Sequence, residues 1–209
     1  MDIFHITQDD PCFPPALKNH FSDQTPSSIW ALGNFDIIGA KPLALFCSAK
    51  CTGSIILKTV DTIKQLRDAE VAIASGFHSP LERECLNILL KGRQPIILCP
   101  ARSIEGMQVK PEIRRPLSDG RLLILSPFGK RRNRISAELA GIRNNFVAAL
   151  AESVFIPYAA PGSKTEKFYA DLINRKKTVY TISDEKTENL RVLGAEIFSM
   201  GVFNLNGNH

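Results

Sequence analysis

Three short turns in the sequence combine small, hydroxylated and basic residues. Each turn follows an apolar, strand-like segment and precedes a helix-like one, where backbone N–H groups at a helix N-terminus attract phosphate. Because parallel strands end at the same edge of a sheet, we expect the three turns to converge on one anion site. The candidate ligands are Ser48, Lys50 and Thr52 in the first turn, Ser75 and Gly76 in the second, and Gly162, Ser163 and Lys164 in the third.

Each turn taken alone has a simpler interpretation. Serine and threonine are favoured where a helix begins, because their hydroxyl groups accept hydrogen bonds from free backbone N–H groups. It is the recurrence of such turns after successive strands, with Lys50 and Lys164 as charge partners, that favours a phosphate site.

A basic stretch provides further candidates. Arg143 and Asn144 begin a helix-like segment, and we include both among the phosphate-binding residues. Such a stretch is also typical of a solvated face, and the formal net charge of +5 permits an anionic partner without requiring one. The other basic residues of the stretch are Lys130, Arg131, Arg132 and Arg134.

No motif identifies a cofactor or a catalytic centre. The sequence contains neither G-x-G-x-x-G nor G-x-x-x-x-G-K-[ST], which disfavours a dinucleotide enzyme or an ATPase. The four histidines lack metal-ligand spacing, and the five cysteines form no C-x-x-C pair, so we interpret the cysteines as free thiols, mostly buried. We predict no cofactor, no metal and no catalytic residues, and a binding protein is favoured over an enzyme.

The elements that would position these turns alternate between strand and helix. The strand-like runs are nearly continuously apolar, which is typical of strands covered by helices on both faces. The predicted fold is therefore α/β, a doubly wound and mostly parallel sheet. The predicted strands are 43–47, 71–75, 95–99, 121–126, 154–157 and 178–182, and the predicted helices are 55–66, 81–90, 143–150 and 166–173.

The chain of 209 residues, 44% of them hydrophobic, is long enough for one substantial core. Prolines interrupt residues 1–40, so we expect a short helical or irregular N-terminal cap there, before a main domain at 41–200 and a fraying tail at 201–209. No apolar run reaches the roughly 20 residues of a membrane span. Because the N-terminus is acidic and polar where a signal peptide would be basic and apolar, we expect a cytoplasmic protein without a membrane partner.

The three strand-end turns and the segments around them resemble the DprA/Smf family, a group of Rossmann-like proteins in the SLOG superfamily. Residues 13–17 and 29–34 are similar to the family's Y-P-x-x-L and P-x-x-L-Y-x-x-G-N segments. Residues 44–52 resemble its strand and G-S-R-x-x-[ST] turn, and residues 75–77 its S-G turn. The other matches are 122–126 with the strand before S-E, 143–146 with the R-N-R helix, 162–165 with the S-G-[ST] turn, and 177–182 with the next strand.

The resemblance implies an extended Rossmann-like fold whose strand-end turns bind single-stranded DNA. It also implies a homodimer and, as in relatives that act in DNA uptake, recombination or repair, delivery of DNA to a RecA-type recombinase. Several positions depart from the family pattern: Cys47, Ala49, Pro80, Pro127 and Asn145. Ala49 replaces the arginine of G-S-R, a phosphate ligand that Lys50 can replace only as a point charge.

Two other functions stay open at this stage. One is a sensor or hydrolase of small nucleotides, because residues 161–166 partly resemble the phosphate loop of cytokinin-activating phosphoribohydrolases, and Glu82 or Glu166 would be its acid. The other is a structural or regulatory protein that has kept the fold and lost its ligand. Phe77 and Tyr158 are candidates for base stacking, although aromatic residues in such positions more often belong to the core or its rim.

Overall fold

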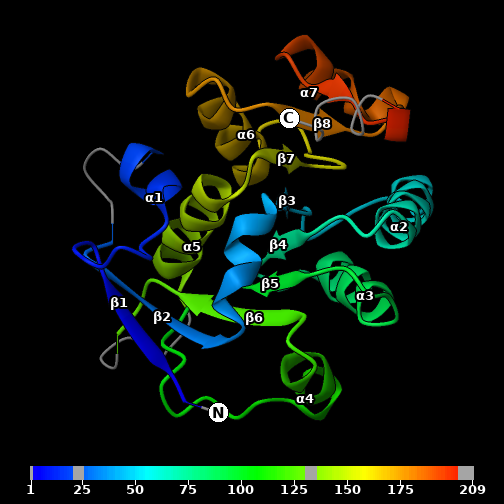
Figure 1. The fold of residues 1–209 in the computed structure, drawn as a ribbon. Coiled ribbons are helices and arrows are strands. Elements are labelled where there is room, and N and C mark those ends of the chain that lie inside the picture. The colour runs from blue at the N-terminus through cyan, green and yellow to red at the C-terminus, as the bar shows by residue number, and fades with distance from the viewer. Residues whose placement is uncertain (1, 21–25, 130–135, 202–209) are drawn as a thin grey trace.

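Helices cover both faces of a nine-stranded sheet in the computed structural model, which describes residues 2–20, 26–129 and 136–201 (Figure 1). The strand order is β1-β2-β6-β5-β4-β3-β7-β8-β9. Strand β2 pairs antiparallel with β1 on one side and with β6 on the other, and all other pairings are parallel. The strands are β1 (Phe4–Thr7), β2 (Ser28–Gly33), β3 (Leu43–Leu45), β4 (Ile73–Ser75), β5 (Ile96–Leu98), β6 (Leu122–Ser126), β7 (Ser153–Phe155), β8 (Val179–Thr181) and β9 (Glu196–Ile197).

The predicted doubly wound, mostly parallel sheet is confirmed, and each predicted strand overlaps one of the strands from β3 to β8. The expectation of a purely helical or irregular N-terminal cap is wrong for β1 and β2. The prolines lie outside these strands, with Pro26 just before β2 and Pro15 at the first position of a helix, where its missing N–H costs nothing. The residues after Pro26 are therefore free to pair with β6.

The four predicted helices are present, with somewhat different ends. Helices α4 and α7 lie outside the predicted set, and α4 contains Pro116, a residue that usually interrupts a helix. The helices are α1 (Pro15–His20), α2 (Gly53–Asp68), α3 (Pro80–Leu89), α4 (Pro111–Ser118), α5 (Ala137–Leu150), α6 (Lys164–Asn174) and α7 (Glu188–Val192), with 3₁₀ turns at η1 (Phe35–Ala40) and η2 (Glu185–Thr187).

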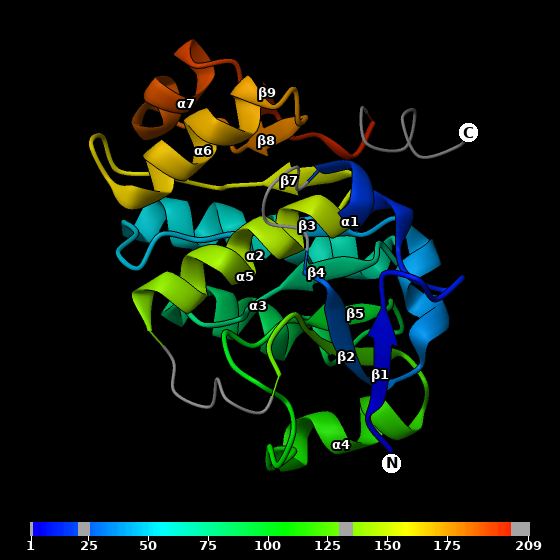
Figure 2. The ribbon, with the colours of Figure 1, turned by 90° about the vertical axis from the view of Figure 1, so that its left-hand side faces the viewer.

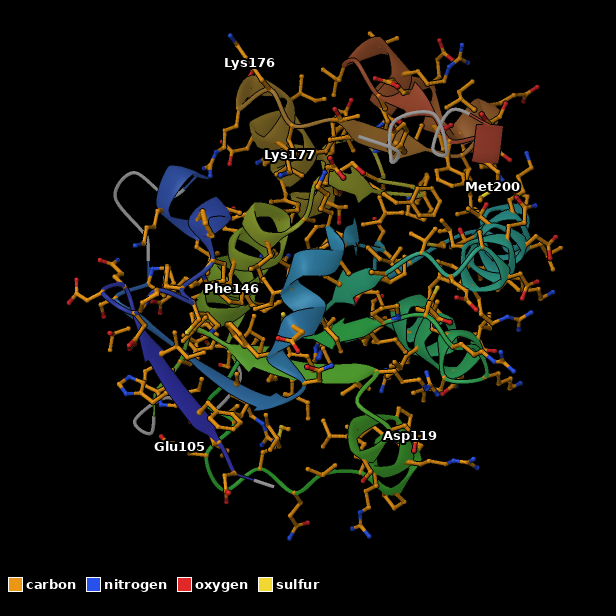
Figure 3. All side chains as sticks on the ribbon, in the orientation of Figure 1. Glu105, Asp119, Phe146, Lys176, Lys177 and Met200 are labelled. Carbon is orange, nitrogen blue, oxygen red and sulfur yellow. The ribbon has the colours of Figure 1, made fainter. Side chains whose placement is uncertain are left out.

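Two hydrophobic cores lie on opposite faces of the sheet. Alternate residues of β3 divide between them: Leu43 and Leu45 pack with α2 and α3, whereas Ala44 packs with α1, α5 and α6. Phe146, labelled in Figure 3, extends from α5 into the second core and is 1% exposed. Helices therefore reach the sheet from both sides, and the entries to the helices after β3, β4, β6 and β7 lie along one edge, at the left in Figure 2.

Candidate nucleic-acid interface

The chain reverses its direction across the sheet at β3. From β3 it moves through β4 and β5 to β6, and after α5 it returns to β7 on the other side of β3. Ligands of open α/β sheets bind at such a switch point, where the loops leaving the two neighbouring strands diverge. The strand order thus places a binding crevice at the carboxyl ends of β3 and β7.

A pocket of about 370 Å³ lies at this switch point. Its walls come from the loops after β3 and β4, from the first turns of α3 and α6, and from the middle of α5. The lining residues are Phe46, Cys47, Ala49, His78, Ser79, Pro80, Glu82, Arg83, Arg143, Asn144, Lys164, Thr165 and Phe168. Three of the predicted site residues, Arg143, Asn144 and Lys164, line this pocket, and only Lys164 among them belongs to one of the three predicted turns.

Glu82 organises the loops around the pocket. Its side chain is buried in the first turn of α3, where Oε1 accepts a hydrogen bond from the backbone N–H of Cys47 at 2.9 Å. Oε2 accepts from the backbone N–H groups of His78 at 2.7 Å and Ser79 at 3.1 Å. One carboxylate thereby fastens the loop after β3 to the loop after β4. The S-x-x-E spacing of a capping box predicts the contact with Ser79, but the contact with Cys47 depends on the tertiary structure.

Arg143 differs from its sequence-based prediction. It lies within α5 rather than at its start, and only 5% of it is exposed. Its Nη1 donates to the carbonyl of Cys99 at 3.2 Å, and its Nε donates to Asn144 Oδ1 at 2.8 Å. Burial lowers the pKa of Arg143, while the nearby Glu82 carboxylate opposes that change. Arg143 is thus a fixed cation in the pocket wall, not an exposed contact.

Gly76 makes room for this guanidinium. A Cβ atom at position 76 would lie 1.1 Å from Nη1 of Arg143, so any side chain would displace the arginine. The hydroxyl of Ser75, in the same turn, is buried and accepts from the N–H of Phe77 at 3.1 Å. The second turn therefore positions Arg143 and does not supply direct ligands from Ser75.

The first turn contributes less than the sequence predicts. Ser48 is buried, and its hydroxyl donates to the carbonyl of Tyr158 at 3.0 Å, which joins the loops after β3 and β7. Lys50 and Thr52 are exposed and lie outside the pocket lining, although Thr52 is the N-cap residue of α2. The pocket instead contains Ala49, the position where the family pattern has arginine.

The third turn is shaped by its own polar contacts. Gly162 has a φ of +72°, in the left-handed region where glycine is favoured. Ser163 caps α6 by accepting from the N–H of Glu166 at 3.1 Å, and Glu166 accepts from the N–H of Gly162 at 2.6 Å. Hydrogen bonds from Asn189 and Gly162 lower the pKa of Glu166. These contacts hold the first residue of α6, Lys164, at the pocket.

The pocket lining carries more positive than negative charge. Arg83, Arg143 and Lys164 are its cations and Glu82 is its one carboxylate, which already accepts three backbone hydrogen bonds. Phe168, half-buried beside Phe46 with ring centroids 5.0 Å apart, adds an aromatic surface. Sequence reasoning missed both aromatic residues and named Phe77, which is buried in the core. The predicted basic residues 130–134 lie outside the described part of the chain.

Of the five free cysteines, Cys47, Cys85 and Cys99 are buried, Cys51 is half-buried and Cys12 is exposed. Burial raises the pKa of Cys51 to about 11 and that of Cys99 to about 12, so these thiols stay protonated at neutral pH. Across residues 2–20, 26–129 and 136–201, no group of three or more His, Cys, Asp or Glu side chains is placed to hold a metal ion. Every helix in these ranges is too short or too polar to span a bilayer.

An open α/β sheet with a cationic pocket at its switch point defines a Rossmann-like protein with an anion-binding type of site. The family model of DNA recombination-mediator protein A matches residues 4–192, and the chain belongs to this family. A search of curated protein sequences found no match.

Solved structures agree with this fold. DNA processing protein A from Streptococcus pneumoniae superposes with a TM-score of 0.78 at 19% identity, covering 99% of this chain and 74% of the other. DNA processing protein A from Helicobacter pylori, whose structure addresses its single-stranded DNA binding mode, superposes with a TM-score of 0.77 at 18% identity, covering 98% of this chain and 97% of the other. The molybdenum cofactor carrier protein of Chlamydomonas reinhardtii superposes with a TM-score of 0.53 at 12% identity, covering 79% of this chain and 97% of the other.

Proposed function

We propose that this protein binds single-stranded DNA in the pocket at the β3–β7 switch point and acts as a recombination mediator in DNA uptake, recombination or repair. The observation that carries the proposal is the excess of cations in the lining: Arg83, Arg143 and Lys164 against Glu82. Phosphates would supply most of the affinity, and Phe168 offers a surface on which a base can stack without regard to its sequence. Family membership and the Helicobacter pylori relative support the same ligand.

The engaged carboxylates weigh against the nucleotide hydrolase considered from the sequence. Glu82 accepts three backbone N–H groups, and Glu166 accepts from Gly162 and Asn189. A general acid or base must be within reach of a substrate proton. Both groups are instead used to hold loops in place.

The test is fluorescence anisotropy of labelled oligonucleotides with matched lysine variants of α6. Lys164→Ala should weaken binding about tenfold, because a charge-assisted contact to phosphate is lost, and should reduce the salt slope by about 0.7. The control is Lys167→Ala, which removes the same charge from an exposed position outside the pocket lining. Equal effects of the two variants, or wild-type binding that is absent at micromolar protein or indifferent to salt, would reject the proposal.

Ala49→Arg provides a gain-of-function test of the same pocket. Ala49 is exposed and lines the pocket, so an arginine there can hold two phosphate oxygens at once. We expect tighter binding by Ala49→Arg and little effect of Lys50→Ala, because Lys50 lies outside the lining. A loss of affinity with Ala49→Arg would contradict the placement of DNA in this pocket.

We also propose a cytoplasmic location and, from the family resemblance, a homodimer and delivery of DNA to a RecA-type recombinase. Exposed apolar side chains near the β9 edge of the sheet support the dimer: Val192 and Leu193 at the end of α7, 77% and 42% exposed, and Ile197 in β9, 41% exposed. Sedimentation of the wild type and of Val192→Asp tests this, and a monomeric wild type would exclude it.

A further inference from the structure

A second hollow, separate from the pocket at the switch point, lies in the connection between β5 and α4. Its volume is about 720 Å³, and none of its lining residues belongs to the first pocket. It is lined by Arg102, Gln108, Val109, Lys110, Pro111 and Arg114. Two of these residues, Pro111 and Arg114, belong to α4, which lies below β6 in Figure 1, whereas α6 lies beside β7 and β8 at the top of the view.

The lining of this basic hollow contains three cations and no carboxylate. Nε of Arg114 donates to the carbonyl of Val109 at 3.2 Å, which holds the guanidinium while its two Nη groups have no protein partner among the described residues. Lys110 approaches Glu112 only to 3.9 Å, and both side chains are largely exposed, so the pair is weak. No ion pair within residues 2–20, 26–129 and 136–201 neutralises Arg102 or Arg114.

One short loop connects the basic hollow to the first pocket. The carbonyl of Cys99 accepts from Arg143 in the pocket wall, and three residues later Arg102 lines the hollow. The carbonyl of Arg102 accepts a hydrogen bond from the hydroxyl of Ser126 at 2.8 Å, which fixes this loop to the end of β6. Three residues span at most about 11 Å, so the two sites lie within reach of one extended strand of nucleic acid.

We propose that the basic hollow is a second phosphate subsite, which binds the backbone of the single-stranded DNA that occupies the first pocket. Arginine suits this role because its planar guanidinium can pair with two phosphate oxygens. The subsite rests on the proposed function, since it extends the path of the same ligand. A short oligonucleotide occupies the first pocket alone, whereas a longer one reaches both sites.

The experiment compares oligonucleotides of about 4 and about 16 nucleotides, the range of site sizes of single-strand-binding folds. Arg114→Ala should weaken binding of the longer oligonucleotide about tenfold and lower its salt slope by about 0.7, and it should leave binding of the shorter one unchanged. The control is Arg115→Ala, the next residue of α4, which is 91% exposed and outside the lining. Arg115→Ala removes the same charge and should leave the affinity for both the shorter and the longer oligonucleotide unchanged.

Lys110→Ala is a second variant, because the side chain of Lys110 is largely exposed and its ion pair with Glu112 is weak. Thermal melting verifies that both variants are folded. Selective loss with the longer oligonucleotide in either subsite variant supports the subsite. Three results would overturn the subsite while leaving the proposed function intact. They are equal effects of Arg114→Ala and Arg115→Ala, equal effects of a subsite variant on both oligonucleotide lengths, or no effect of either subsite variant. A wild-type protein that binds neither length overturns the proposed function, and the subsite with it.

Discussion

The buried carboxylate of Glu82 offers the sharpest test of how the binding pocket is held together. We consider Glu82→Gln, which preserves the size of the side chain and removes its charge. The two oxygens of the carboxylate accept three backbone N–H groups, two on Oε2 and one, from Cys47, on Oε1. An amide has one oxygen and one NH2 group, so it can retain the two hydrogen bonds from His78 and Ser79 but not the one from Cys47 as well. The N–H of Cys47 would then face another donor in a buried site.

The expected loss of stability follows from these contacts. Leaving a buried donor unpaired costs about 1–3 kcal/mol, and the lost charge weakens the remaining hydrogen bonds as well. The guanidinium of Arg143 also loses its favourable interaction with the carboxylate. We therefore expect the free energy of unfolding to fall by about 3 kcal/mol, which in a protein of this size lowers the melting temperature by about 9 °C.

Urea denaturation followed by circular dichroism, with thermal melting alongside, measures this change. The matched control is Glu84→Gln, on the same helix, where the exposed Glu84 accepts one hydrogen bond from Asn87 at 3.3 Å. The control should stay within about 0.5 kcal/mol of the wild type. If Glu82→Gln and Glu84→Gln were equally stable, the carboxylate would not be fastening the loops, and our account of the pocket would be wrong.

Two further predictions concern the neighbouring turns. Gly76→Ala should drive the guanidinium of Arg143 from its site and weaken DNA binding about tenfold. Gly141→Ala is the control, because a Cβ there meets no atom within 4 Å, and it should leave binding unchanged. Anisotropy titrations that show equal affinities for the two variants would contradict this prediction. Hydrogen bonding, first from Asn189, holds the folded pKa of Glu166 below its ordinary 4.5, so its stabilising contribution is present above that value and is lost as pH falls through the folded pKa. The stability difference between wild type and Glu166→Gln should therefore shrink between about pH 6 and about pH 3 in urea titrations, and a constant difference would refute the assignment.

Local sequence patterns were sufficient for the parallel sheet and for the edge at which its strands end. Apolar runs of strand length separated by helical periodicity leave few arrangements other than a doubly wound sheet, and the exits of its strands must then share an edge. Helix starts such as Ser79–Glu82 and Ser163–Glu166 were equally local, because capping involves residues three positions apart. Hence Lys164 could be placed at the start of a helix on the strand-exit edge from the sequence.

Contacts between distant segments decided the rest. Ser28–Gly33 becomes a strand by pairing with Leu122–Ser126, about ninety residues away, and nothing in its immediate neighbours specifies that pairing. Arg143 looked like an exposed residue at a helix start, yet packing buries it against the carbonyl of Cys99 in the space that Gly76 leaves. The sequence by itself determined the strands β3 to β8, the helices α2, α3, α5 and α6, and the edge that the exits of the strands share. Only the tertiary structure decided which side chains line the pocket and which hold the loops, because burial and hydrogen-bond partners depend on residues far apart in the chain.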